Sequence, residues 1–306
     1  MPRLLKSLRN AVMLENVSRR RLRLPGKKVE IALLDWGGDG PLALLHHANG
    51  FCAGLWGLVA ETLRPHYRVL AMDARGHGDS SRPEGVEAYD WSLLVDDLIA
   101  VAESLLAESG KQRIALGLGH SFGGTLTLSA AARRPDLYEH LVLVDPVLLP
   151  PRDGVPVEMR GRGSELAERA RRRRQVWVDR DEARSFFAGR ELFENWAPRA
   201  LDLYVAEGLR VRDDGQVELK CPGAVEAAIF DQNHSLDLFS EIEVVRAPAR
   251  LLWAKRGNFP LSLYEGLVAR LAEASIEEVD AGHLMPMEQP ERVADAVLRF
   301  TGRVPV

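Results

Sequence analysis

The chain has 306 residues, of which 46% are hydrophobic and 27% are charged, and its formal net charge is −4. This length favours one domain with an insertion over two independent enzymes, and the hydrophobic share is enough for a large core. The small net charge gives no reason to expect a nucleic-acid partner, and no apolar run reaches the length of a transmembrane helix.

The first 28 residues are strongly basic, with nine Lys and Arg residues against the single acid Glu15. We interpret this stretch as a solvated leader that precedes the first strand. Apolar residues from Leu4 to Val12 fall at helical spacing, so an amphipathic helix that lies on a membrane or a partner is the alternative. No signal-peptide pattern is present.

Apolar runs and helical periodicity alternate along the first half of the chain. Pro25-Gly26 separates two runs that together predict an antiparallel hairpin. Predicted strands cover 19–24, 29–36, 42–45, 67–72, 114–118 and 140–144. Predicted helices begin near Leu55 and cover 91–108 and 125–133. Strands that alternate with helices indicate a parallel sheet that is covered on both faces.

The pattern changes after Pro150. Residues 151–240 hold no strong strand signal but several helical stretches, at 164–178, 181–193, 198–208 and 223–230. An all-helical insertion between two strands predicts a lid over the carboxyl edge of the sheet. We interpret the arginine run at 171–174 as a solvated helix face, with a phosphate or carboxylate clamp as the alternative. The core resumes with strands at 249–254 and 276–279 and helices at 261–273 and 290–300.

Ser121 lies at the junction between a predicted strand and a predicted helix, within Gly119-His120-Ser121-Phe122-Gly123. A strand that passes into a helix within one tight turn forces the turning residue into an unfavourable backbone conformation. Glycine at 119 and 123 lets the two elements close. The turn raises the serine hydroxyl above the carboxyl end of the sheet, and the Phe122 N–H points at whatever bonds to that oxygen. The alternative is a glycine-rich turn whose serine only caps the helix.

Four stretches then follow one another in a characteristic order: His47-Ala48-Asn49-Gly50, Asp73 to Ser80, Gly119 to Gly124, and Gly282-His283 ahead of Pro286 to Glu291. On these stretches the chain resembles an α/β-hydrolase-fold protein from about residue 29 to about residue 301. The resemblance implies an α/β fold with an eight-stranded, mostly parallel sheet and a helical cap inserted after the sixth strand. The expected organisation is a basic leader with the first strand over 1–28, a core over 29–147 and 241–306, and a helical cap over 148–240.

A serine nucleophile requires partners. Its hydroxyl is a poor nucleophile near its normal pKa, so an imidazole must take its proton, and His283 is the candidate. The developing oxyanion needs two donors. Phe122 N–H is one, and the resemblance implies the N–H of Asn49 as the other, with Ala48 and Gly50 as alternatives. Four other histidines resemble structural positions of the family: His46, His47, His77 and His120.

The third member of the triad departs from the family pattern. The family usually places its acid after the seventh strand, and the matching stretch here, 253–260, contains no carboxylate. Asp145 is the favoured replacement because it ends the sixth strand at the same edge of the sheet, although an Asp-Pro turn explains it too. Asn258 could orient His283 as an amide, without the charge that stabilises an imidazolium. The weaker candidates are Asp231 and Asp280.

These features predict a serine hydrolase that cleaves an ester or related acyl bond of a small, largely apolar substrate through an acyl-enzyme on Ser121. Aromatic residues of the cap offer an apolar wall, although packing alone explains most of them. They are Phe186, Phe187, Phe193, Trp196, Tyr204 and Phe230. The alternatives are a ligand-binding or receptor-like member of the fold, and a cofactor-free lyase or perhydrolase with the same triad.

The sequence carries no glycine-rich phosphate loop, metal-ligand cluster or nicotinamide fingerprint, so we expect no cofactor and no metal. The expected partner is a small-molecule substrate, without nucleic acid or stable membrane insertion, and the chain is expected to be a monomer or homodimer. Cys52 and Cys221 have no metal or redox spacing, so we expect unpaired thiols in a cytoplasmic protein.

Overall fold

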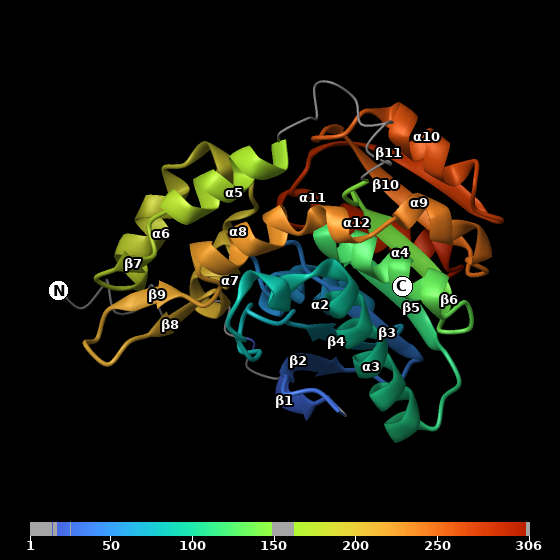
Figure 1. Cartoon of the computed structure of the whole chain (residues 1–306), viewed down its shortest axis with the longest axis horizontal. Helices are drawn as coiled ribbons and strands as arrows, with labels where there is room; N and C mark the ends of the chain where they lie inside the picture. The colour runs from blue at the N-terminus through green and yellow to red at the C-terminus, as the bar shows by residue number, and fades with distance from the viewer. Residues whose placement is uncertain (1–13, 15–16, 25, 149–161, 304–306) are drawn as a thin grey trace.

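The computed structural model describes residues 14, 17–24, 26–148 and 162–303, and contains one large sheet of eight strands (Figure 1). Their order is β1-β2-β4-β3-β5-β6-β10-β11. The strands are β1 (Ser18–Arg23), β2 (Glu30–Gly37), β3 (Leu42–His46), β4 (Arg68–Met72), β5 (Ile114–His120), β6 (Tyr138–Val144), β10 (Ala249–Arg256) and β11 (Ala274–Gly282). The β1–β2 and β2–β4 pairs are antiparallel, and every later pair is parallel. The predicted hairpin and the mostly parallel sheet are therefore confirmed.

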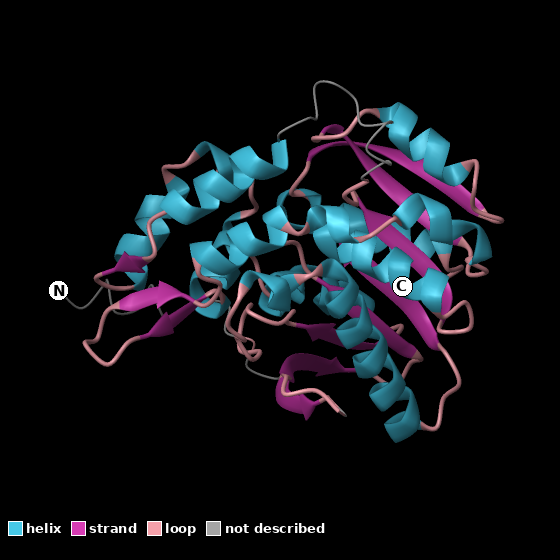
Figure 2. Ribbon diagram, viewed as in Figure 1, coloured by secondary structure: helices cyan, strands magenta, loops and turns pink. Residues whose placement is uncertain are grey.

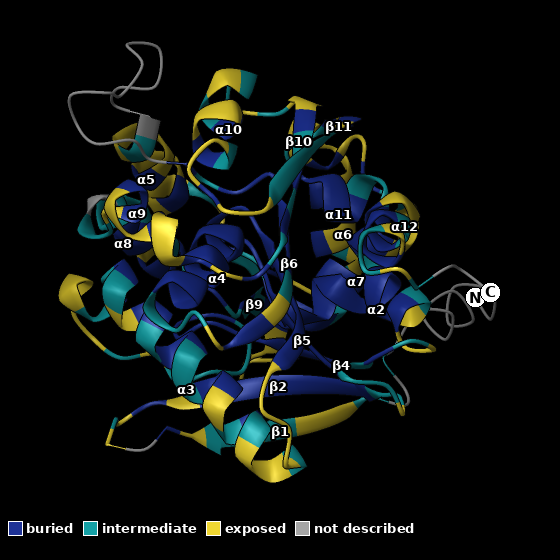
Figure 3. Ribbon diagram, turned by 90° about the vertical axis from the view of Figure 1, so that its right-hand side faces the viewer, coloured by how far each residue is buried: buried dark blue, intermediate teal, exposed yellow. Residues whose placement is uncertain are grey.

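Helices cover both faces of this sheet. Successive strand residues point to opposite sides, so each face presents apolar side chains that a helical layer must cover. In β3, Leu42 and Leu44 join one hydrophobic cluster, and Ala43 and Leu45 join the other. On the first face lie α3 (Trp91–Ser109), α4 (Phe122–Arg133), α9 (Leu238–Glu241) and α10 (Leu261–Val268). On the second lie α2 (Gly57–Leu63) and α12 (Pro290–Phe300). Figure 3 shows that the central strands and α4, which packs on the first face, are buried.

The insertion between β6 and β10 is not all-helical, which corrects the sequence-based expectation (Figure 2). Its helices are α5 (Arg162–Arg172), α6 (Arg180–Ala188), α7 (Pro198–Glu207) and α8 (Gly223–Asp231). It also contains a small antiparallel sheet of β7 (Val176–Trp177), β9 (Val217–Leu219) and β8 (Leu209–Val211). Strands of two or three residues are too short to show a period of two, so the sequence carried no signal for them.

The insertion has a hydrophobic cluster of its own that also includes residues of the core. Trp177, Phe187, Phe193, Trp196 and Tyr204 are buried in it, with ring centroids of Phe193 and Trp196 4.7 Å apart. Most of the predicted cap aromatics therefore pack against one another. The core residues in this cluster follow the carboxyl ends of β3 and β11. They are Cys52, Leu55, Leu58, Leu284 and Met287. The insertion consequently covers the carboxyl edge of the sheet.

Short helical turns complete the chain. They are η2 (Ala53–Trp56), η3 (Val86–Tyr89), η6 (Glu191–Phe193), η7 (Asn233–Ser235), η8 (Ile242–Val244) and α11 (Met285–Glu288). No helix in the described parts of the chain is long and apolar enough to cross a membrane. The predicted leader and its amphipathic alternative fall mostly on residues 1–13, which lie outside the described residues.

Candidate active site

Ser121 stands at a sharp turn between β5 and α4, with φ 53° and ψ −122°. A positive φ is unfavourable for any residue with a side chain, so the neighbouring packing must hold it. A Cβ at Gly119 would collide with the carbonyl oxygen of Gly123, and one at Gly123 would lie 2.5 Å from His46 O. Ser121 makes no side-chain capping bond to α4. Its hydroxyl points to another partner, so the helix-cap interpretation does not describe this turn.

That partner is His283, which follows β11. The Ser121 hydroxyl donates to His283 Nε2 at 2.9 Å, and His283 Nδ1 donates to Asp145 Oδ2 at 2.6 Å. His120 Nε2 donates to the backbone oxygen of His283 at 2.8 Å and so fixes the chain at that point. Three side chains from the ends of β5, β6 and β11 thus form one hydrogen-bonded line.

The carboxylate behind His283 is that of Asp145, and it is fully buried. Its backbone has φ 39°, which makes it, with Ser121, one of two non-glycine residues with a positive φ in the described chain. The other candidates have different neighbours. Asp231 pairs with Arg171, and Asp280 pairs with Arg256. Asn258 is not the group at His283 Nδ1, because Asp145 occupies that position.

The loop after β3 lies next to this line, and its hydrogen bonds narrow the choice of oxyanion donor. The Gly50 N–H donates to His77 Nε2 at 3.0 Å, so Gly50 is already engaged. With Gly50 engaged, the backbone N–H groups of Asn49 and Ala48 remain as candidates. The side chain of Asn49 donates to Glu226 O of α8 at 3.0 Å and ties this loop to the cap. Phe122 is the first residue of α4, where backbone N–H groups have no partner within the helix.

A family model described as "Alpha/beta hydrolase family" matches residues 43–296 of the chain. The chain belongs to the alpha/beta hydrolase family. The resemblance inferred from the four motifs is confirmed, and the matched span contains Ser121, Asp145 and His283.

Relatives of this alpha/beta hydrolase include enzymes that act on small molecules. N-formylmaleamate deformylase of Pseudomonas putida is 30% identical over 259 residues, which cover 83% of this chain and 86% of that protein. The "AB hydrolase superfamily protein YfhM" of Bacillus subtilis is 33% identical over 108 residues, and the match spans 35% of this chain and only 36% of that protein.

Solved structures share the fold. E-2-(acetamidomethylene)succinate hydrolase has a TM-score of 0.78 at 21% identity, over 94% of this chain and 99% of that one. A thermophilic esterase from Thermogutta terrifontis has a TM-score of 0.68 at 24% identity, over 94% and 100%. At these identities the likeness shows the fold and no more, and it confirms the predicted architecture of this alpha/beta hydrolase.

Buried histidines support the loop after β3. His47 Nδ1 donates to Ala48 O at 2.8 Å, and His47 Nε2 accepts from the Ala74 N–H at 3.0 Å. Burial lowers the pKa of His47 to about 4 and holds the pKa of His77 well below its usual value. Both rings are therefore neutral near pH 7, and each can accept a hydrogen bond from the backbone.

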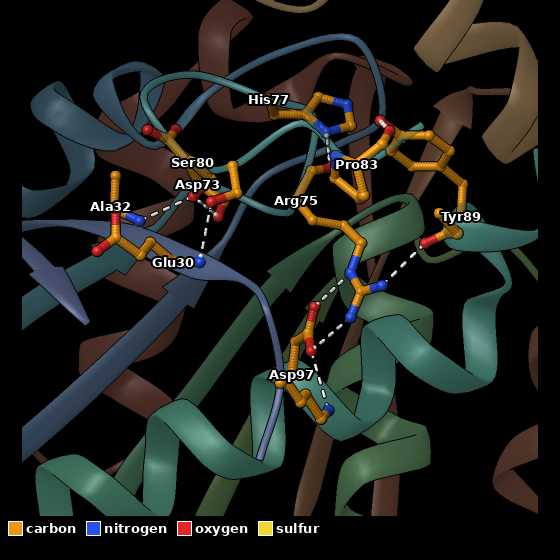
Figure 4. A network of polar contacts seen from close by, with 12 residues as sticks. Glu30, Ala32, Asp73, Arg75, His77, Ser80, Pro83, Tyr89 and Asp97 are labelled. Carbon is orange, nitrogen blue, oxygen red and sulfur yellow. Dashed lines mark hydrogen bonds and ion pairs between the residues drawn. The ribbon is translucent and has the colours of Figure 1, made fainter. Parts of the chain in front are cut away.

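The Asp73 to Ser80 stretch is held by an ion pair beneath it (Figure 4). Arg75 donates to Asp97 of α3 through Nε at 2.6 Å and through Nη2 at 2.7 Å, and both side chains are buried. Lys27 reaches the same carboxylate at 2.9 Å. The carbonyl of Arg75 in turn accepts from His77 Nδ1 at 3.2 Å. The ion pair thus supports the histidine that contacts Gly50.

The arginine run of this alpha/beta hydrolase pairs with acids of the chain itself. Arg171 pairs with Asp231, Arg172 with Glu168, Arg173 with Glu226 and Arg174 with Glu182. Arg173 also donates to the Tyr204 hydroxyl at 3.0 Å. Arg171 and Arg173 join α8 and Arg174 joins α6, whereas Arg172 and Glu168 form an exposed pair within α5. The run is therefore neither a purely solvated face nor a clamp left open for a ligand.

Sequence reasoning missed two residues near the site. Asp97 lies on the buried face of α3 with Leu94, Leu98 and Val101. An acid on a buried helix face is a signal that a cation packs against it, because a buried charge needs a partner. Tyr264 of α10 donates to Asp145 Oδ1 at 2.9 Å. Nothing in the local pattern around Tyr264 sets it apart from an ordinary core aromatic.

Proposed function

We propose that this chain is a serine hydrolase that cleaves an acyl bond through a covalent intermediate on Ser121. The single observation that carries the proposal is the line from Ser121 Oγ through His283 to Asp145, with distances of 2.9 and 2.6 Å. An inert serine in a glycine-rich turn needs neither contact. The family to which the chain belongs supports hydrolase chemistry, and the site supplies the groups that the chemistry requires.

In the first step, Ser121 Oγ attacks the carbonyl carbon while its proton passes to His283 Nε2. The imidazolium formed is stabilised by the Asp145 carboxylate at Nδ1. The oxygen of the tetrahedral intermediate accepts hydrogen bonds from the N–H groups of Phe122 and Asn49. The intermediate collapses, the leaving group takes the proton from His283, and the acyl group stays on Ser121.

In the second step, water attacks the acyl carbon and gives its proton to His283. A second tetrahedral intermediate forms at the same donors, and its collapse releases the acid and returns the proton to Ser121 Oγ. Ser121 is only 6% exposed, which shields the intermediate from bulk water and strengthens each of these electrostatic contacts.

The substrate that we propose is a small, largely apolar ester. The walls near the site are mostly apolar: the ring of Phe259 lies 6.1 Å from the His283 ring, and Phe51 packs against Trp196 and Tyr204 of the cap. A cavity lies beside the loop after β3 that contains Ala48 and Asn49. It is lined by Phe51, Leu55 and Met287 among others and has room for about one water molecule. These apolar walls support the proposal of a largely apolar substrate.

A second candidate is a small amide. One relative, whose match covers 83% of this chain, is by its name a deformylase of N-formylmaleamate. An acyl-enzyme forms from amides by the same steps as from esters. The two candidates differ only in the leaving group, which is an amine for the amide and an alcohol for the ester.

The test begins with a fluorophosphonate probe, which reacts rapidly only with an activated serine. We expect labelling of the wild-type protein and none of Ser121→Ala. p-Nitrophenyl esters of rising chain length and N-formyl amides are then compared by burst and steady-state kinetics. A burst with turnover supports the hydrolase, and the preferred series decides between ester and amide. A burst without turnover favours the ligand-binding alternative, and an unlabelled wild type contradicts the proposal.

A further inference from the structure

The Asp145 carboxylate has hydrogen-bond donors from three separate elements. Oδ1 accepts from the Ala254 N–H of β10 at 3.1 Å and from the Tyr264 hydroxyl of α10 at 2.9 Å. Oδ2 accepts from His283 Nδ1 at 2.6 Å. A carboxylate that is fully buried requires such donors, because burial without them destabilises its charge. The two oxygens therefore have separate tasks, and only Oδ2 faces the histidine.

Among the described residues, Tyr264 is the one side-chain donor to Asp145 Oδ1. Its residue is fully buried, and its hydroxyl also lies 3.1 Å from Pro146 O. Burial and the neighbouring Asp145 carboxylate raise the pKa of Tyr264 well above its ordinary value, so the hydroxyl keeps its proton. The Tyr264 hydroxyl has one proton, and Pro146 O alone could accept the hydrogen bond from it. The shorter contact to the charged oxygen is the stronger of the two.

The loop that follows β10 leaves space for the same carboxylate. A Cβ added at Gly257 would lie 2.8 Å from Asp145 Oδ2. In the sequence this loop is where an acid is expected and absent. In the structure β10, this loop and α10 instead enclose an acid that comes from the neighbouring strand β6.

We propose that Tyr264 is a positioning residue of this active site, whose hydroxyl holds Asp145 Oδ1 so that Oδ2 stays aligned with His283 Nδ1. The inference rests on the proposed function, in which Asp145 is the triad acid. Tyr264 touches neither the serine nor a substrate, and it acts only through the carboxylate. The Ala254 N–H and the loop at Gly257 surround the same carboxylate.

The test compares Tyr264→Phe with a matched control, Tyr138→Phe. Tyr138 is also buried, lies on β6, and has a hydroxyl without a hydrogen-bond partner in the described structure. Both variants lose one buried hydroxyl from a phenyl ring. Only Tyr264→Phe removes a hydrogen bond to Asp145. The fraction of protein that the fluorophosphonate finally labels measures how much of each variant is folded.

Rates of labelling and of ester turnover are measured from about pH 5 to about pH 9. For Tyr264→Phe we expect a plateau kcat lower by about tenfold, an unchanged KM, and an acidic limb that moves to higher pH. The limb moves because the carboxylate, with one donor fewer, holds the His283 proton more tightly. His120 also faces His283, and because burial lowers the pKa of His120 to about 3, it stays neutral throughout this range.

A readout that needs no turnover separates this inference from the proposed function. The Nδ1 proton of His283 gives an NMR resonance whose position reports the bond to Asp145. We expect it to shift in Tyr264→Phe and to stay in place in Tyr138→Phe. Failure of wild-type labelling counts against the proposed function alone. An unchanged resonance, or an equal loss of rate in both variants, overturns the role of Tyr264.

Discussion

Asp145 Oδ2 lies 2.6 Å from His283 Nδ1, although the two residues are 138 positions apart in the chain. The carboxylate comes from the end of β6 and the imidazole from the loop after β11, and β10 lies between those two strands. The acid therefore reaches across one strand to the histidine. Asp145 has a positive φ of 39°, a conformation that Asp tolerates better than most residues.

The first prediction concerns the choice of acid. Asp145→Asn removes the charge behind His283 and is expected to lower kcat about 10⁴-fold with little effect on folding. Asn258→Ala is expected to be mild, because Asn258 does not occupy the position at His283 Nδ1. Steady-state kinetics with an activated ester, together with circular dichroism, measure both. Losses that are equal and small would remove Asp145 from its role.

The second prediction concerns the turn at Ser121. Gly119→Ala places a methyl group against the carbonyl of Gly123, where backbone must move, so we expect a loss of about 1–3 kcal/mol in the free energy of unfolding and slower labelling of the serine. The control is Gly266→Ala in α10, where an added Cβ meets nothing within 4 Å. That variant should gain about 0.5–1 kcal/mol. Urea unfolding of both variants measures these changes in stability, and equal unfolding midpoints would refute the predicted strain at Gly119.

The third prediction concerns acid lability. Burial lowers the pKa of His47 to about 4 and that of His120 to about 3, whereas an unfolded histidine titrates near 6.5. The unfolded chain therefore binds protons below about pH 6.5 that the folded chain excludes. Stability should be full above that pH and fall as the pH drops toward 4, by about 2 kcal/mol at pH 5 for each ring.

Urea unfolding at pH 7 and pH 5 measures this loss. His120→Gln removes one of the excluded protons, so its stability should fall less between the two pH values than that of the wild type. A stability that does not change between pH 7 and pH 5 would contradict the prediction.

The fourth prediction concerns the ion pair under the Asp73 to Ser80 stretch. Asp97→Ala leaves the Arg75 guanidinium buried without its carboxylate and is expected to cost about 3–5 kcal/mol of stability. Arg172→Ala breaks an exposed pair with Glu168 and should change stability by less than about 1 kcal/mol. Thermal unfolding compares the two. A similar, small effect in both would show that the buried pair contributes little.

The sequence by itself determined the features that depend on neighbouring residues. The alternation of strands and helices, the hairpin of β1 and β2, and the turn at Ser121 all follow from local periodicity and from glycine at 119 and 123. Membership of the family followed from four short motifs in order. The strands of the large sheet and most of the helices were predicted within three residues at their ends, because their periods are long enough to be read. The predicted helices 164–178, 181–193 and 261–273, however, extend five or six residues beyond the ends of α5, α6 and α10.

Only the tertiary structure decided which groups meet across the sheet. Asp145 and Asn258 follow the adjacent parallel strands β6 and β10, whose carboxyl ends meet at one edge, so chain position could not separate them. The backbone at Asp145, the space left by Gly257 and the hydroxyl of Tyr264 make that separation. The short strands of the cap and the partners of its arginines were also beyond local patterns, because both depend on contacts between distant segments. Such contacts are set by packing and not by periodicity.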